Sequence, residues 1–229
     1  MNSEKVHNQL QSAKSPCGGF RGLGLFLFLF LSITASAQTI LLDRPEIFIG
    51  TSQGITVSQL VFNPSVRQDW LFGYNGGIAF RYIAERNLGL QIELNYSQRG
   101  WKERDNLYAR RLNYIELPFL AYISSGGERV SVFLTIGPKA SWLLSEEVLF
   151  NNSDNTDMRH TDPIANRFDY GATLGGGIQF MAGRQIFSLE LRANYSLSTT
   201  FSNDRLHSRY AFSNNINAAL NLAWMMRVN

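Results

Sequence analysis

A ten-residue stretch of strict alternation, Leu88–Ser97, limits what this chain can fold into. Every second residue from Leu88 to Tyr96 is apolar, and the residues between them are glycine or polar. Successive side chains leave opposite faces of a β-strand, so the pattern predicts a strand with one apolar and one polar face. About 9–11 residues of tilted strand cross the hydrocarbon core of a bilayer, so the length also fits a membrane-spanning strand.

The same alternation recurs and predicts eight strands. They are Glu46–Ile55, Leu71–Ile83, Leu88–Ser97, Arg110–Ile123, Arg129–Leu143, Arg167–Met181, Gln185–Thr199 and Asn214–Met226. Three connections are tight turns, namely Ala84–Asn87, Ser124–Glu128 and Ala182–Arg184, and four are long, namely Thr56–Trp70, Arg99–Ala109, Leu144–Asn166 and Thr200–Ser213. Short periplasmic turns that alternate with long outer loops are typical of bacterial outer-membrane barrels. We therefore expect an all-β fold, an eight-stranded antiparallel up-and-down transmembrane β-barrel with both ends in the periplasm.

The N-terminus has the three regions of a secretory signal peptide. Lys5, Lys14 and Arg21 form a basic region, Gly22–Ile33 is apolar, and Ala35-Ser36-Ala37 offers small residues to signal peptidase. We expect residues 1–37 to be a cleaved signal peptide and residues 38–229 to be the barrel domain. The alternative is a single membrane anchor, against which the short apolar region and the cleavage-type ending argue.

Cysteine and charge exclude several function classes. Cys17 is the only cysteine and precedes the apolar run, whereas a lipoprotein cysteine follows it. Cleavage would leave no thiol, which excludes disulfides, cysteine nucleophiles and cysteine metal sites. It would also remove three of the 21 basic and one of the 18 acidic residues, so the net charge of +3 falls to +1. No clustered basic stripe indicates a nucleic acid partner, and we expect no cofactor, no metal and no catalytic residue.

Aromatic residues gather near the ends of the predicted strands on their apolar faces. They are Tyr82, Tyr96, Trp142, Tyr195 and Trp224. Taken singly, each could be ordinary packing. Their shared placement indicates the aromatic girdle found at membrane interfaces, so the lipid of the outer membrane is the expected surroundings of the barrel.

Two of the predicted strands resemble strands of a known protein family. The stretch Tyr-Ile-Glu-Leu-Pro-Phe-Leu-Ala-Tyr at Tyr114–Tyr122, with Gln91–Tyr96 before it and Ile136–Lys139 after it, resembles the PorT-like family of outer-membrane β-barrel proteins, often labelled "porin family". The similarity covers roughly Ile47 to Trp224. It implies an eight-stranded barrel in a Gram-negative outer membrane and a link to protein secretion, with envelope or secretion-system proteins as partners. No family catalytic residues exist to carry over.

The polar faces of the strands contain charged residues that would point into the barrel. They are Arg81, Glu93, Glu116, Lys139, Asp169, Glu190 and Arg192. An eight-stranded barrel is just wide enough for side chains to fill it, and an isolated buried charge is very costly. We therefore expect an interior polar network, in which Glu93, Glu116, Glu190 and Arg192 form ion pairs. A gated ion path or binding site is the functional alternative. Inward glycines (Gly73, Gly77, Gly171, Gly175 and Gly177) would make room for the longer side chains.

The predicted outer loops hold the remaining candidates for chemistry. His160 and His207 lie there with Asp162, Asp204 and Ser208. A surface hydrolase or acyltransferase could use such residues, but no spacing motif supports one. The run around Asp154 and Asp157 lacks the glycine of an EF-hand, so we interpret it as a solvated loop.

Three functions are compatible with this sequence. The first is a non-enzymatic outer-membrane barrel with a structural or secretion-related interaction role. The second is a small pore for ions or solutes. The third is a soluble barrel of the lipocalin type, which holds a ligand inside. A lipocalin would turn the apolar faces inward, and the polar faces here are dominated by Gly, Ser, Asn, Thr and Gln with few lysines, which favours a filled membrane barrel.

The signal peptide gives a direct prediction. The order of basic, apolar and small residues predicts cleavage after Ala37. N-terminal sequencing of the protein recovered from the envelope should therefore begin at Gln38. A mature protein that retains Cys17 would contradict cleavage and support the single-anchor alternative.

Overall fold

The computed structural model describes residues 41–63, 67–85, 87–104, 108–152, 164, 166–199 and 212–228. The predicted signal peptide lies outside these residues. Nine strands are present: β1 (Leu41–Asn63), β2 (Gln68–Asp69), β3 (Leu71–Glu85), β4 (Leu88–Glu103), β5 (Tyr108–Gly126), β6 (Val130–Asn151), β7 (Phe168–Ala182), β8 (Gln185–Ser196) and β9 (Phe212–Arg227). Within the described ranges, no helix is long and apolar enough to cross a membrane.

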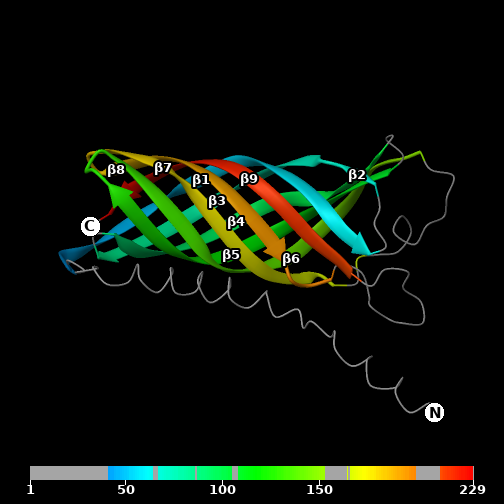
Figure 1. Cartoon of the computed structure of the whole chain (residues 1–229), viewed down its shortest axis with the longest axis horizontal. Helices are drawn as coiled ribbons and strands as arrows, with labels where there is room; N and C mark the ends of the chain where they lie inside the picture. Colours follow the sequence, from blue (N-terminus) through cyan, green and yellow to red (C-terminus); the bar gives the residue numbers. More distant parts are fainter. Residues whose placement is uncertain are drawn as a thin grey trace, which may run out of the picture. The chain divides into compact units, whose positions relative to one another are not determined.

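Eight of these strands close a barrel (Figure 1). Each long strand pairs antiparallel with the next long strand along the chain, and β9 returns to pair with β1 over sixteen residue pairs, from Phe48↔Arg227 to Asn63↔Phe212. The ninth strand, β2, has two residues and adds to the end of β4. The predicted eight-stranded antiparallel up-and-down barrel is therefore confirmed, and closure leaves the wall without a free edge through its middle.

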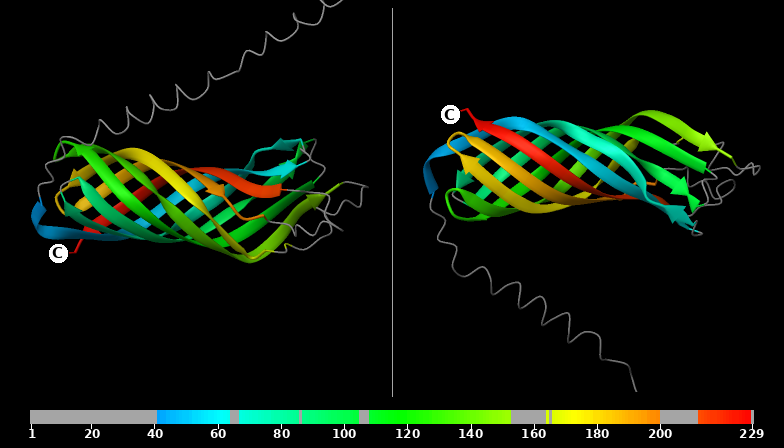
Figure 2. Two further views of the ribbon diagram at one scale, coloured as in Figure 1. Left: turned by 60° about the horizontal axis from the view of Figure 1, so that its bottom comes forward. Right: turned by 90° about the horizontal axis from the view of Figure 1, so that it is seen from above.

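The connections lie alternately at the two ends of the barrel, but the predicted long connection Arg99–Ala109 is reduced to the four residues between β4 and β5. The three short turns lie at one end of the barrel, where β1 begins and β9 ends, and the strand ends that the other connections join lie at the opposite end, which we call the long-connection end (Figures 1 and 2). Gly126 and Gly183, at two of the short turns, have φ angles of +143° and +64°. Glycine adopts such positive φ angles without the steric cost that other residues meet, which keeps these turns short.

The two faces of the wall meet opposite surroundings. On β4, Gln91 points inward and is 3% exposed, whereas Ile92 points outward and is 37% exposed. The same division holds around the barrel, with large hydrophobic side chains outside and most buried polar ones inside. A lipocalin-type barrel requires the reverse arrangement, so that alternative is wrong. An outer surface of this kind needs lipid as its solvent.

The strands extend further at the long-connection end than the alternation predicts. Parts of the predicted connections Thr56–Trp70, Arg99–Ala109 and Leu144–Asn166 are strand, since β1 continues to Asn63, β4 to Glu103 and β6 to Asn151. In these extensions the strict division of polar and apolar residues is lost, because the buried positions are mixed: Arg99, Trp101 and Glu103 on β4, and Thr56, Ser58 and Leu60 on β1. Without a strict alternation, such a segment resembles a loop in the sequence.

Two prolines interrupt the hydrogen-bonded ladders beside β5. The β4–β5 register runs from Ile92↔Phe119 directly to Asn95↔Glu116, which omits the pairs that would include Pro118. The β5–β6 register similarly passes from Pro118↔Lys139 to Ala121↔Ile136, around Pro138. Proline has no N–H to donate to a ladder. The Glu-Leu-Pro motif therefore marks a stretch of wall with fewer backbone hydrogen bonds.

The facial division predicts the outcome of two neighbouring substitutions. Arginine on the lipid face near the midplane costs about 2–4 kcal/mol in such barrels, so Ile92→Arg should impair assembly. Gln91→Ser changes the inner face and should leave a folded barrel. Gel mobility with and without boiling measures the folded fraction, because folded barrels of this kind resist detergent until heated. Equal folding of the two variants would contradict the assigned faces.

Candidate functional site: the filled barrel interior

The interior has three layers along the barrel. A layer of charged and polar side chains occupies the middle. An apolar cluster closes each end of it: Phe48, Ala79, Ile83, Tyr122, Phe133, Ile186 and Met225 at the short-turn end, and Leu60, Trp101, Tyr108, Leu112, Tyr114, Leu143 and Ile164 at the long-connection end. We call these the short-turn cluster and the long-connection cluster. The strand extensions supply Leu60, Trp101 and Tyr108 of the second.

Arg192 on β8 is the centre of the first ionic cluster. Its Nη1 and Nη2 donate to the two carboxylate oxygens of Glu93 on β4, at 2.6 and 2.7 Å. Nη2 also donates to Oε2 of Glu190 at 2.7 Å. Thr135 donates to Oε1 of Glu190 at 2.7 Å, and Asn95 donates to Oε2 of Glu93 at 2.6 Å. A bidentate guanidinium–carboxylate pair is among the strongest polar contacts in proteins, and here it joins β8 to β4 through the interior.

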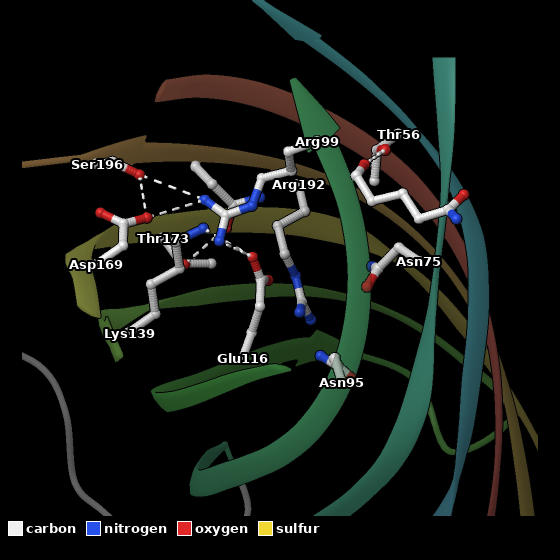
Figure 3. A network of polar contacts seen from close by, with 12 residues as sticks. Thr56, Asn75, Asn95, Arg99, Glu116, Lys139, Asp169, Thr173, Arg192 and Ser196 are labelled. Carbon is white, nitrogen blue, oxygen red and sulfur yellow. Dashed lines mark hydrogen bonds and ion pairs between the residues drawn. The ribbon is translucent and has the colours of Figure 1, made fainter. Parts of the chain in front are cut away.

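Arg99 on β4 is the centre of the second ionic cluster (Figure 3). Its Nη2 lies 2.5 Å from Oε1 of Glu116 on β5, and its Nη1 donates to Oδ2 of Asp169 on β7 at 3.1 Å. Lys139 on β6 donates to the same Glu116 oxygen at 3.4 Å, and Ser196 on β8 donates to Asp169 at 2.7 Å. This cluster therefore joins five neighbouring strands from within.

Arg81 is bound differently. Its Nε donates to Oε1 of Gln91 at 2.7 Å, and its Nη1 donates to Oε1 of Gln179 at 3.1 Å. The guanidinium carbon lies 4.0 Å from the centre of the Tyr122 ring, a cation–π contact of the kind arginine often makes. No carboxylate of the described residues forms a salt bridge with Arg81. Gln91 also donates to Glu93, so a hydrogen-bonded path connects Arg81 to the first ionic cluster.

The buried charges of the described chain balance. Five are cations, namely Arg81, Arg99, Arg110, Lys139 and Arg192, and five are anions, namely Glu93, Glu103, Glu116, Asp169 and Glu190. Each would be costly in a low-dielectric interior without partners. The interior thus satisfies its charges mainly among its own side chains.

A glycine makes the first ionic cluster possible. A Cβ atom at Gly175 on β7 would lie 2.2 Å from Oε1 of Glu190 and 2.4 Å from Oγ1 of Thr135. Both distances are shorter than any real contact of a Cβ atom, so a side chain here would displace the Glu190–Thr135 hydrogen bond. The predicted role of the inward glycines, to make room for longer side chains, applies at this position.

The structure places all six residues of the predicted network inside the barrel. It brings Glu93, Glu190 and Arg192 together in one cluster and Glu116 and Lys139 in the other. Arg81 joins through glutamine side chains. Arg99 was assigned to a charged loop, and that assignment is wrong, because Arg99 lies on β4 and is buried in the interior. Arg99 is an even number of residues from Gln91 and Glu93, so it lies on the same face of the strand. Continuing the alternation for two residues beyond Ser97 would have placed Arg99 in the interior.

Other candidates for chemistry lie elsewhere. His160, His207, Asp162, Asp204 and Ser208 are outside the described residues, as are Asp154 and Asp157. Within the described part of the chain, no group of three or more His, Cys, Asp or Glu side chains could hold a metal ion. The described interior carboxylates contact cations and polar side chains.

Sequence comparison identifies the family. The outer membrane protein beta-barrel domain family matches residues 37–202. The chain belongs to this family. Membership, the closed barrel and the apolar outer surface together indicate a bacterial outer membrane protein. No curated protein matches the chain.

Solved structures with a similar backbone fold have low sequence identity to this chain. Neisserial surface protein A is 11% identical over 81% of this chain and 100% of its own, with a TM-score of 0.48. OprG from Pseudomonas aeruginosa is 11% identical over 80% of this chain and 93% of its own, with a TM-score of 0.45. The outer membrane enzyme PagL is 10% identical over 77% of this chain and 97% of its own, also with a TM-score of 0.45. These likenesses concern the fold alone.

The first ionic cluster gives a stability prediction. Arg192→Leu would leave Glu93 and Glu190 buried without their cation, and breaking a buried ion pair from one side costs about 3–5 kcal/mol. We expect the urea midpoint for unfolding in lipid vesicles to fall accordingly. Arg184→Leu, at an exposed residue of the β7–β8 turn, is the matched control and should change little.

A further substitution separates loss of charge pairing from loss of packing. Adding Glu93→Gln and Glu190→Gln to Arg192→Leu removes the two unpaired charges and should recover part of the lost stability. If Arg192→Leu alone unfolds at the wild-type midpoint, the cluster does not stabilise the barrel.

Proposed function

We propose that this protein is a non-enzymatic outer-membrane barrel with a sealed interior, whose role is structural or a secretion-related interaction in the envelope. The filled interior carries the proposal. Two apolar clusters enclose a charge-balanced polar layer, and several side chains in each layer are almost completely buried, among them Trp101, Arg99 and Tyr122. An interior occupied in this way is suited to stability rather than transport.

The polar side chains of the interior also argue against catalysis there. A catalytic carboxylate needs access to a substrate and a pKa matched to its task. Glu93, Glu116 and Glu190 are almost completely buried and each contacts at least one cation. The described interior residues therefore have a structural role, and contacts with partner proteins would use surfaces at the ends of the barrel.

The secretion-related part rests on the resemblance to PorT-like barrels. That resemblance centres on Tyr114–Tyr122. The structure gives two residues of this segment particular roles, because Glu116 belongs to the second ionic cluster and Pro118 interrupts the ladder to β4. Envelope or secretion-system proteins are the partners that this resemblance supports.

A small pore is the second candidate, and one observation favours it. Along β9, the side-chain amides of Asn215 and Asn217 are buried and have no hydrogen-bond partner among the described residues, and neither does Nδ2 of Asn221. Buried polar groups are usually paired with protein or with ordered water. A file of water along β9 would satisfy these amides and would offer a narrow path for ions.

Conductance separates the two candidates. Purified protein inserted in planar bilayers should show no steady conductance, since the interior is filled. Heat-dependent gel mobility checks that the protein is folded, so that a lack of conductance cannot be attributed to unfolded protein. A persistent conductance that Asn217→Leu reduces would establish the pore along β9 and overturn the proposal. Leu220→Ile, on the lipid face of the same strand, is the control and should change nothing.

A further inference from the structure

A hollow in the outer wall lies where β6, β7 and β8 approach the long-connection end. It measures about 630 Å³, and Trp142, Arg167, Phe168, Tyr170, Leu197 and Ser198 are among the residues that line it. Of these residues, Ser198 is connected to the interior, because its hydroxyl donates to Oδ1 of Asp169 in the second ionic cluster. Trp142 pairs with Phe168 in the β6–β7 register, and the N–H of Leu197 donates to the carbonyl oxygen of Tyr170 at 2.8 Å, so the backbone of the hollow is part of the sheet.

The membrane-facing side of the hollow is aromatic. The ring centres of Trp142 and Phe168 are 6.4 Å apart, and those of Phe168 and Tyr170 are 6.3 Å apart. All three side chains are about half exposed. Toward the middle of the barrel, the outward face of β7 continues with Ala172 and Leu174. Aromatic belts of this kind lie at the level of lipid headgroups.

The other side of the hollow carries a cation. Arg167 directly precedes β7, and its carbonyl oxygen accepts a hydrogen bond from the N–H of Leu143 at 2.8 Å, which fixes its backbone on the barrel. Its side chain is exposed and forms no salt bridge with any described residue. The outward faces of β7 and β8 contain no charged side chain. Arg167 therefore lies at the end of the apolar outer face of β7, at the level expected for lipid headgroups.

We propose that this hollow binds a phosphorylated glycolipid of the outer leaflet, with the acyl chains against the apolar wall and a headgroup phosphate on Arg167. The occupant must be amphipathic, because the lining combines three aromatic rings with one cation, Arg167. Guanidinium groups bind phosphate through paired, charge-assisted hydrogen bonds. A sugar ring packs well on exposed aromatic faces, which Trp142, Phe168 and Tyr170 supply here. The proposal requires the long-connection end to face outward, as in other outer-membrane barrels.

Native mass spectrometry of the purified barrel tests the proposal. The probe is a bisphosphorylated, acylated glucosamine disaccharide, compared with the same lipid after enzymatic removal of its phosphates. Wild-type protein should retain the phosphorylated lipid, and Arg167→Gln should weaken retention about tenfold, as expected for loss of one charge-assisted contact. Trp142→Leu keeps an apolar side chain but removes the ring, and it should weaken retention of both lipids.

Matched controls make the outcome decisive. Arg184→Gln removes an exposed arginine at the opposite end of β7 and β8 and should leave retention unchanged. Inorganic phosphate should compete poorly, because it lacks the apolar part of the ligand. Equal retention by wild type and Arg167→Gln, or equal retention of the two lipids by wild type, would overturn the proposal. Strong competition by inorganic phosphate would show a site for free anions instead of lipid.

Discussion

The rest of this structure depends on one constraint: a barrel wall is a single strand thick, and its two faces meet different solvents. Lipid outside accepts only apolar side chains, so the polar residues of each alternating strand must point inward. There they meet little water and must satisfy one another. The bidentate contact between Arg192 and Glu93, and the clustering of Arg99 with Glu116 and Asp169, follow from this requirement.

Alternation makes the strands and their faces predictable from sequence, but only within the membrane. Leu88–Ser97 is a clear example, since each lipid-facing position is apolar and each inward position is small or polar. Toward the long-connection end the inward face mixes polar and apolar residues, as at Arg99, Trp101 and Glu103. The strict alternation is lost there, which is why these extensions were assigned to loops and Arg99 with them.

The contents of the interior were also predictable, whereas the individual partners were not. Parity alone places Glu93, Lys139 and Arg192 inside. Which of them meet depends on the stagger between strands that are far apart in sequence, and local pattern does not determine that stagger. Arg81 shows the limit, because its inward direction follows from the alternation but its contacts with Gln179 and Tyr122 come from β7 and β5.

The contact between Arg192 and Glu93 has a mechanical consequence. β4 and β8 lie on opposite sides of the eight-stranded ring, so this contact works as a strut across the diameter. A closed sheet of eight strands resists stretching along its hydrogen bonds but can flatten into an ellipse. The strut opposes that flattening at the depth where Pro118 and Pro138 remove backbone pairs from the neighbouring wall. The contact between Arg192 and Glu93 thus opposes a change in the barrel's cross-section beside the stretch of wall where backbone hydrogen bonds are missing.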